Sequence, residues 1–387
     1  MSHDFERVSQ VSSRDLGSRI AFLKLLHIDL WLFIPLVLLS ASGLVVLYSA
    51  SGQSEPMMTA QIRNLVIAFA VLLVTAQIRM ETLKLVSPYM FVLGVVLLVG
   101  VAFFGVGAKG AQRWLSLGFV RFQPSEIMKV AMPLAVAWWL SKKALPPTSK
   151  SLVIAAMMVA LPSFLILQQP DLGTSLLVAS SGLAVIYMAG IQWRYILSLI
   201  VVALMSIWPA WVFVLKDYQK QRILTLFNPE SDRLGAGWNI IQSKTAIGSG
   251  GWKGLGWTQG SQAQLDFLPE GHTDFIIAVL AEEFGFRGVS LLFLFYSAIL
   301  FRGLVITWRA QSSFARLLAG ALITTFFFGL VVNLGMVTIG LVSGLLPVVG
   351  VPLPMVSYGG TAMVSMMVAF GILMAISTEK PVTRAMR

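Results

Sequence analysis

The chain has 387 residues, of which 57% are hydrophobic and only 12% are charged, and its mean hydropathy is +0.82. An ordinary soluble domain carries about 25% charged residues, so this composition indicates a membrane protein and excludes a string of soluble domains. The net charge of +11 would suit nucleic acid, but in a multispan protein it reports topology, and no nucleic-acid partner is expected. The absence of cysteine excludes disulfides, thiolate zinc sites and cysteine nucleophiles.

Apolar runs of roughly 20 residues, the length that a bilayer core requires, recur along the whole chain. We predict an all-α integral membrane protein with about ten transmembrane helices, at about 31–51, 62–78, 85–106, 126–141, 151–168, 173–190, 195–215, 274–304, 316–340 and 357–377. The interpretation makes 1–387 a single polytopic membrane domain with tails at 1–30 and 378–387. No removable signal peptide is evident, so the first span is expected to direct insertion.

The positive residues indicate which way the chain lies in the membrane. If both termini are cytoplasmic, that side collects sixteen Lys and Arg residues in tails and short loops, against four in the short loops opposite, which are Arg63, Lys109, Arg113 and Arg121. Because positive residues favour the cytoplasmic side, we predict cytoplasmic N and C termini. The long connection 216–273 then faces outward as one large extracytoplasmic loop.

Before that loop, two groups of charges stand out. In QPSEIMK, Glu126 and Lys129 are three residues apart and can neutralise each other, either as a structural ion pair or as contacts to a charged substrate. Lys109, Arg113 and Arg121 lie on the outer side, where cations are uncommon; they suit an anionic headgroup or pyrophosphate, or are simply solvated.

Within the outer loop, 235–260 contains eight glycines interleaved with Trp238, Trp252 and Trp257. Such a segment is too aromatic for a flexible linker, and no Gly-Lys-Ser/Thr follows the glycines, so nucleotide binding is not supported. It is predicted to be either a folded lid whose glycines let the backbone approach a ligand, or an inert cap.

The loop closes with LPEGHTDFII, which places Glu270, His272 and Asp274 against the start of an apolar run. An Asp in the first turn of a helix is stabilised by the dipole, and from the residues alone capping is favoured over a role as general base. Further along, Glu282 is expected to line the same cavity as Asp274, and Glu283 to pair with Arg287.

Six ordered segments carry a resemblance: HIDLWL with SASG, KGAQRWLSLG with QPSEIMK, QPDLGTS, NPESDRLGAGWNIIQSKTAIGSGGWKGLGW, FLPEGHTDFIIAVLAEEFG and GLLPVVGVPLPMVSYGG. Over essentially its full length the chain resembles the SEDS (shape, elongation, division, sporulation) family of bacterial peptidoglycan glycosyltransferases, and most of all the members that act in cell elongation.

The resemblance implies a multi-pass protein of the bacterial inner membrane that polymerises lipid II into glycan strands, with its active site facing the periplasm. It implies that Asp274 is the catalytic general base and undecaprenyl pyrophosphate the leaving group. Candidate residues for substrate or pyrophosphate binding are Lys109, Arg113, Glu126, Lys129, His272, Glu282, Ser357 and Tyr358. Expected partners are a class B penicillin-binding transpeptidase, lipid II, the nascent strand and membrane lipids.

No cofactor is required by the sequence. A divalent cation, Mg²⁺ or Mn²⁺, could share the neutralisation of the pyrophosphate, but no dedicated carboxylate cluster is seen for it, and no metal ligands are assigned. One departure from the family pattern is an apparent insertion near 338–342. Two alternative functions stay open: a lipid II flippase, and a non-catalytic scaffold for the transpeptidase.

Overall fold

The structure is a computed structural model that describes residues 27–108, 111–116, 118, 121–214, 220, 236–265, 267–268, 271–334 and 352–379. Its helices and strands are α2 (Leu30–Ala50), α3 (Glu55–Ala76), α4 (Met80–Phe104), β1 (Val106–Ala108), β2 (Ala111–Ser116), β3 (Arg121–Phe122), α5 (Pro124–Ser141), α6 (Ser149–Gln168), α7 (Leu172–Met188), α8 (Trp193–Pro209), the π-helix η1 (Ala210–Val214), α10 (Ala236–Gly250), α11 (Ser261–Gln264), α12 (Ile276–Arg309), α13 (Ser313–Leu334) and α15 (Gly360–Thr378).

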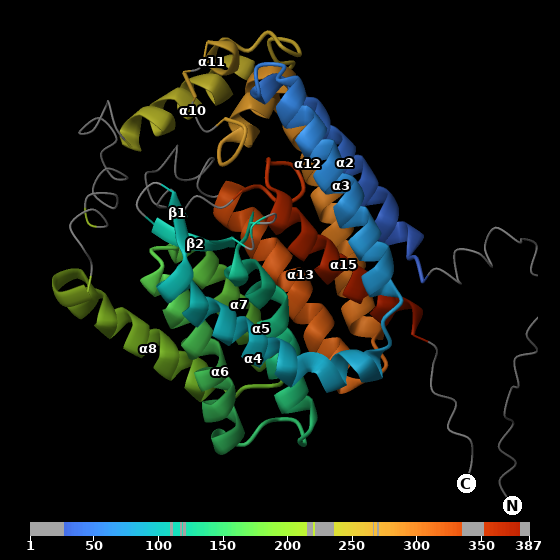
Figure 1. Cartoon of the computed structure of the whole chain (residues 1–387), viewed down its shortest axis with the longest axis vertical. Helices are drawn as coiled ribbons and strands as arrows, with labels where there is room; N and C mark the ends of the chain where they lie inside the picture. Colours follow the sequence, from blue (N-terminus) through green and yellow to red (C-terminus); the bar gives the residue numbers. More distant parts are fainter. Residues whose placement is uncertain are drawn as a thin grey trace, which may run out of the picture.

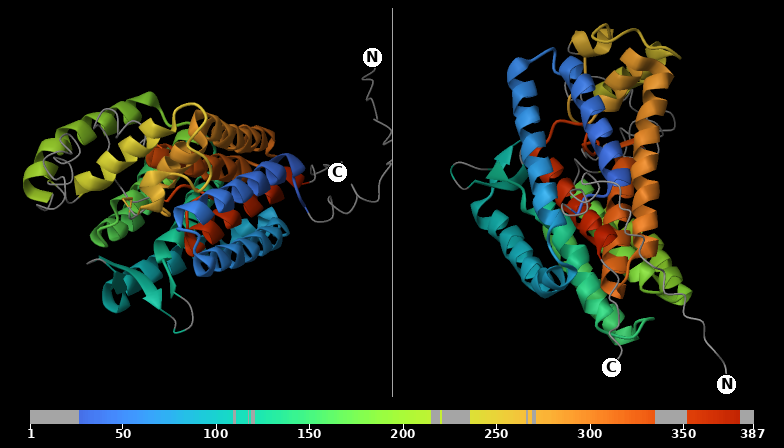
Figure 2. Two further views of the ribbon diagram at one scale, coloured as in Figure 1. Left: turned by 90° about the horizontal axis from the view of Figure 1, so that it is seen from above. Right: turned by 90° about the vertical axis from the view of Figure 1, so that its right-hand side faces the viewer.

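Long helices form a bundle, with α10 and α11 across one end (Figure 1). The start of α2 and the end of α15 meet at the other end, since Ser377 donates a hydrogen bond to Asp29 (Figure 2). Arg302 of α12 also binds Asp29, with Nη2 2.6 Å from Oδ2. Burial raises the pKa of the Asp29 carboxyl, but the hydrogen bonds from Arg302 and Ser377 outweigh it and hold that pKa below its usual value.

Every predicted span has a described helix at its place. Seven of the described helices are long and apolar enough to cross a membrane by length and composition: α2, α3, α4, α6, α12, α13 and α15. The membrane fold is therefore confirmed, whereas the count of ten crossings stays a prediction. The tenth helix begins at Gly360 and not at 357, so Ser357 and Tyr358 lie in the turn before it. The apparent insertion near 338–342 lies outside the described residues.

Burial separates central from peripheral helices. Most of α13 and over half of α15 are buried inside the bundle, whereas α3 and α4 turn most of their apolar side chains outward. Outward-facing Val74, Phe103 and Phe104 would be unfavourable in water but suit hydrocarbon. The periphery is thus built for lipid and the centre for packing.

Local sequence signals set several helix starts as predicted. Pro124 occupies the first turn of α5 with Glu126 just after it. The side chain of Asp171 caps α7 by accepting from the Thr174 amide at 3.1 Å. The loop before α5 differs from the all-helical expectation, because β1, β2 and β3 form a small antiparallel sheet with Gly107 opposite Gln112 and Leu115 opposite Phe122.

A break divides α12 at Gly285, whose φ of 62° and ψ of −161° are not helical. The short first half, 276–284, is almost wholly buried, and the long second half continues to Arg309. The glycine-rich segment after α10 lies against this break, since Leu255 donates to the Glu282 carbonyl at 2.9 Å and Phe286 donates to the Gly251 carbonyl at 3.0 Å. This segment of the outer loop is therefore docked on α12.

Candidate active site

Asp274 lies in a turn just before α12, and its residue is half-buried. The N-cap of the helix is Phe275, so the prediction that Asp274 sits in the first helical turn is wrong: it precedes the cap. Its backbone is fixed, because Asn333 of α13 donates from Nδ2 to the Asp274 carbonyl at 3.2 Å. The Asp274 carboxylate therefore belongs to a turn whose backbone is held in place by a hydrogen bond. Glu270, its predicted neighbour, lies outside the described residues.

A second turn, 352–359, holds the same segment from the other side. The Tyr358 amide donates to the His272 carbonyl at 3.0 Å, and the Ser357 hydroxyl donates to the Thr273 carbonyl. That hydroxyl also accepts from the Leu353 amide at 2.9 Å. Ser357 and Tyr358 therefore act here as supports of the Asp274 turn, a role that differs from the substrate contacts predicted for them.

His272 lies beside Tyr358, with ring centroids 6.5 Å apart in an edge-to-face arrangement. The pair adds a side-chain contact between the two turns. His272 thus shares the Asp274 turn, as predicted, and the residue is partly exposed.

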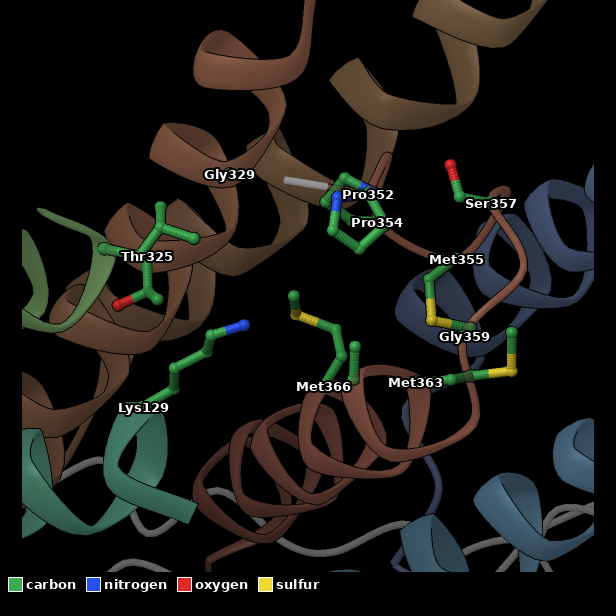
Figure 3. A pocket seen from close by; sticks show the side chains of 12 residues that line it. Lys129, Thr325, Gly329, Pro352, Pro354, Met355, Ser357, Gly359, Met363 and Met366 are labelled. Atoms are coloured by element: carbon green, nitrogen blue, oxygen red, sulfur yellow. The ribbon is translucent and has the colours of Figure 1, made fainter. Parts of the chain in front are cut away.

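A small pocket, with a volume of about 40 Å³, opens below the 352–359 turn (Figure 3). Its lining is mostly apolar and includes Met355, Met363 and Met366, with Ser357 at its edge and Lys129 pointing into it. Methionine side chains are flexible and adapt to irregular apolar groups. Asp274 is not among the lining residues, so Ser357 is the link between the pocket and the Asp274 turn.

The predicted pair of Glu126 and Lys129 is present. Lys129 Nζ lies 2.7 Å from Glu126 Oε1, and Ser365 of α15 donates to Glu126 Oε2 at 2.7 Å. The pair thus joins α5 to α15 and leaves the Lys129 amine at the pocket. Both the structural role and a substrate contact remain compatible with this geometry.

Arg113 does not face the pocket as a free cation. Its guanidinium donates to the carbonyls of Gln169 and Pro170, and it lies 3.8 Å from the Asp171 carboxylate. One third of its side chain remains exposed. Arg113 therefore ties β2 to the turn between α6 and α7. Lys109, its predicted neighbour in the cationic group, lies outside the described residues.

Glu282 is not where the sequence placed it. Its side chain is fully buried beneath the outer loop, and its Oε1 accepts from the Gln262 amide at 3.0 Å and the Ser261 hydroxyl at 3.2 Å. The prediction that it lines a cavity with Asp274 is therefore wrong, because the loop folds over that face of α12. Glu283, expected to pair with Arg287, accepts instead from Ser49 of α2.

Two glycines of the outer loop, Gly250 and Gly254, approach the backbone of α12 closely. A Cβ at Gly250 would lie 1.9 Å from the Ala281 carbonyl oxygen, and one at Gly254 would lie 2.1 Å from that of Glu283. Close approach was predicted, but its target is α12. This glycine-rich part of the loop is a fitted cap on the short half of that helix.

Sequence reasoning missed Gln61 and Asn333, which hold the two turns. Gln61 of α3 donates from Nε2 to the Ser357 carbonyl at 3.4 Å, and Asn333 supports Asp274. The sequence pattern that could have indicated Gln61 and Asn333 is an uncharged amide side chain inside an apolar run. Among the described residues, no group of three or more His, Asp or Glu side chains is gathered to hold a metal. The prediction that a divalent cation could share the neutralisation of the pyrophosphate therefore stays a prediction.

The sequence of the chain also matches a known protein family. Residues 22–381 match the model of the family FTSW_RODA_SPOVE, described as cell cycle protein. This chain belongs to the FtsW/RodA/SpoVE family. The matched range includes all the described helices and both turns.

Relatives within the FtsW/RodA/SpoVE family match over nearly the full length. The chain is 47% identical over 366 residues to the peptidoglycan glycosyltransferase MrdB of Escherichia coli strain K12, covering 95% of this chain and 98% of the relative. It is 34% identical to the probable peptidoglycan glycosyltransferase FtsW of Trichlorobacter lovleyi, covering 92% and 94%.

Solved structures agree with the family assignment. One is a chain from work on the structural coordination of polymerization and crosslinking by a peptidoglycan synthase complex, with TM-score 0.78, 26% identity and coverage of 90% of this chain and 97% of that chain. Another is the rod shape determining protein RodA of Thermus thermophilus, with TM-score 0.68, 25% identity and coverage of 90% and 96%.

Proposed function

We propose that this protein is a peptidoglycan glycosyltransferase that polymerises lipid II at the periplasmic face of the inner membrane. The observation that carries the proposal is the half-buried Asp274, held by Asn333 in the turn that leads from the outer loop into α12. The name of the 47% identical relative supports the same activity. A carboxylate in such a position can accept a proton from a bound hydroxyl.

In the proposed reaction, Asp274 takes the proton of the acceptor GlcNAc 4-hydroxyl while its oxygen attacks the anomeric carbon of the donor MurNAc. A carbon–oxygen bond forms to the acceptor, and the bond to the pyrophosphate breaks with its electron pair. Direct displacement inverts the anomeric carbon. The turn 352–359 serves this step by fixing the backbone of His272 and Thr273, directly before Asp274, since small displacements of a reacting group are costly.

Undecaprenyl pyrophosphate departs with growing negative charge, which a fixed cation stabilises better than water does. Lys129 suits this role because its amine is at the pocket and its partner Glu126 holds it in place. Arg113 can contribute only through the exposed third of its side chain, since its donors are engaged by the turn after α6. The apolar, methionine-rich wall suits the prenyl chain.

The proposed partner is a class B penicillin-binding transpeptidase, which would crosslink the strands. Support comes from the structural neighbour that belongs to a complex coordinating polymerization and crosslinking.

The test uses the purified full-length protein with lipid II and its transpeptidase, and measures glycan strands by gel electrophoresis. We expect strands from the wild type and none from Asp274→Asn. Glu55→Gln is the matched control, since Glu55 is an exposed carboxylate at the start of α3, outside both turns, and it should leave synthesis unchanged. Equal synthesis by Asp274→Asn would remove the proposed base.

A lipid II flippase is the alternative, because the break of α12 at Gly285 is a feature that transporters also use. Translocation of fluorescent lipid II across liposomes by Asp274→Asn, together with no strand synthesis by the wild type, would favour the flippase.

A further inference from the structure

Two adjacent glutamates at the end of the short half of α12 are buried and not used by the proposed chemistry. Glu282 is 0% exposed and Glu283 is 1% exposed. Burying carboxylates is costly unless each gains strong partners, so their contacts are informative. Both contacts reach beyond α12 itself.

Glu282 binds the outer loop. Its Oε1 accepts from the amide of Gln262 and the hydroxyl of Ser261, at the first turn of α11. A Cβ at Gly260 would lie 2.7 Å from Glu282 Oε2, so only glycine leaves room for the carboxylate there. The side chain thus fills a niche in the outer loop.

Glu283 binds α2. It accepts from the hydroxyl of Ser49, and Ser49 in turn accepts from Gln264 Nε2 at 3.0 Å. One serine therefore joins α2, α11 and α12. The Trp257 indole donates to the Val45 carbonyl at 3.1 Å, which adds a second tie between the outer loop and α2.

These contacts lie at one end of the short half of α12, and the other end, Ile276, directly follows the Asp274 turn. The helix from Ile276 to Glu283 rises about 10 Å, and the break at Gly285 frees it from the direction of the long second half. Its direction is therefore set by what holds its two ends. The Asp274 end is held by Asn333, Ser357 and Tyr358, and the far end is held by the two glutamates.

We propose that Glu282 and Glu283 are positioning residues for the glycosyl transfer, which fix the short half of α12 to the outer loop and to α2 and thereby place Asp274. The inference rests on the proposed function. Because misplacing a reacting group by about 1 Å can cost about a hundredfold in rate, loss of these contacts should lower kcat without weakening substrate binding. The outer loop in this account is a scaffold for the base.

The experiment compares wild type, Glu283→Ala, Glu283→Gln and Glu282→Ala as full-length proteins with the transpeptidase. Two quantities are measured: hydrogen exchange of the Leu255 and Gly256 amides, which donate to the carbonyls of Glu282 and Glu283, and the split of lipid II polymerisation into kcat and KM. Ser49→Ala is a milder variant for the case in which Glu283→Ala does not fold. Glu55→Ala is the exposed control.

We expect Glu283→Ala and Glu282→Ala to accelerate exchange of these amides at least about tenfold and to lower kcat at least about tenfold, with KM within about twofold. Glu283→Gln keeps an acceptor for Ser49 and should retain most of the rate. Accelerated exchange with unchanged kcat would overturn the inference, as would unchanged exchange in both alanine variants. A wild type that makes no strands would refute the proposed function instead, and the exchange data would still report on the contacts.

Discussion

At the residue scale, the buried pair of Glu126 and Lys129 shows how one contact can serve both structure and chemistry. The Lys129 amine lies 2.7 Å from one carboxylate oxygen of Glu126, so the two charges neutralise each other, and the Ser365 hydroxyl donates a hydrogen bond to the other oxygen. The amine nevertheless stays at the pocket. An ion pair of this kind holds a cation ready without a second desolvation penalty when substrate arrives.

The Glu126–Lys129 pair is expected to contribute to the free energy of unfolding. Lys129→Met leaves the Glu126 carboxylate buried without its partner, and Glu126→Gln does the reverse to Lys129, so each should cost about 3–5 kcal/mol of unfolding free energy. The double variant should cost less than the sum, because the two residues are in contact. Thermal unfolding in detergent measures all three, and simple additivity would show that the pair is not coupled.

The residues also show what the sequence could and could not provide. QPSEIMK predicted the Glu126–Lys129 pair because the partners are three residues apart on one helix. The HTDF segment indicated Asp274 as a candidate. Its supports Ser357 and Asn333 could not be predicted, because they contact residues 84 and 59 positions away in the sequence, and local spacing rules do not apply over such separations. Glu282 was misplaced for the same reason, since its partners belong to the outer loop.

At the element scale, the outer loop and the two halves of α12 form one unit. Helix positions were predictable from apolar runs, because a bilayer dictates the length of a span. The break at Gly285 and the docking of the loop could not be predicted in this way. They depend on backbone contacts between separate segments of the chain, which hydrophobic periodicity does not report. The small sheet before α5 escaped prediction because its strands are only two to six residues long.

Gly254 tests the docking of the loop. Its φ is 81°, and a Cβ there would lie 2.1 Å from the Glu283 carbonyl oxygen, so Gly254→Ala should lower stability by at least about 1 kcal/mol. Trypsin cleavage at Lys253 should speed up as the loop detaches. Gly248→Ala is the control, since nothing lies within 4 Å of its added Cβ, and it should leave cleavage unchanged. Equal cleavage of the two variants would contradict the docking.

The opposite end of the bundle depends on Asp29, which joins α2, α12 and α15 through Arg302 and Ser377. Because its pKa is lowered in the folded protein from 3.8, its contribution to stability is fully present above that pH and is lost as the pH falls through the folded value. At neutral pH, Asp29→Asn should cost about 3 kcal/mol. Unfolding temperatures of the two proteins should converge on acidification below 3.8, and a constant difference would contradict the assignment.

At the scale of the whole molecule, the bundle has two unlike ends. One end carries α10 and α11 of the outer loop, which leads into the Asp274 turn, and the other carries the cluster around Asp29 (Figures 1 and 2). The bias of Lys and Arg toward the Asp29 end predicts that this end is cytoplasmic. Asp274 would then meet a substrate presented in the outer leaflet.

Orientation can be measured directly, because the chain has no cysteine. A single cysteine at Lys253→Cys should react with a membrane-impermeant maleimide added to intact spheroplasts. Lys143→Cys, at the exposed turn after α5, should react only after the membrane is permeabilised. The reverse pattern would place the Asp274 turn in the cytosol.

The initial rate at which the purified protein releases undecaprenyl pyrophosphate from lipid II tests the role of Asp274 most directly. If this carboxylate is the general base, Asp274→Asn should lower that rate by about 10² to 10⁴ while the protein remains folded and binds lipid II as before. A rate within about threefold of the wild type would contradict the account, since a general base contributes far more than that.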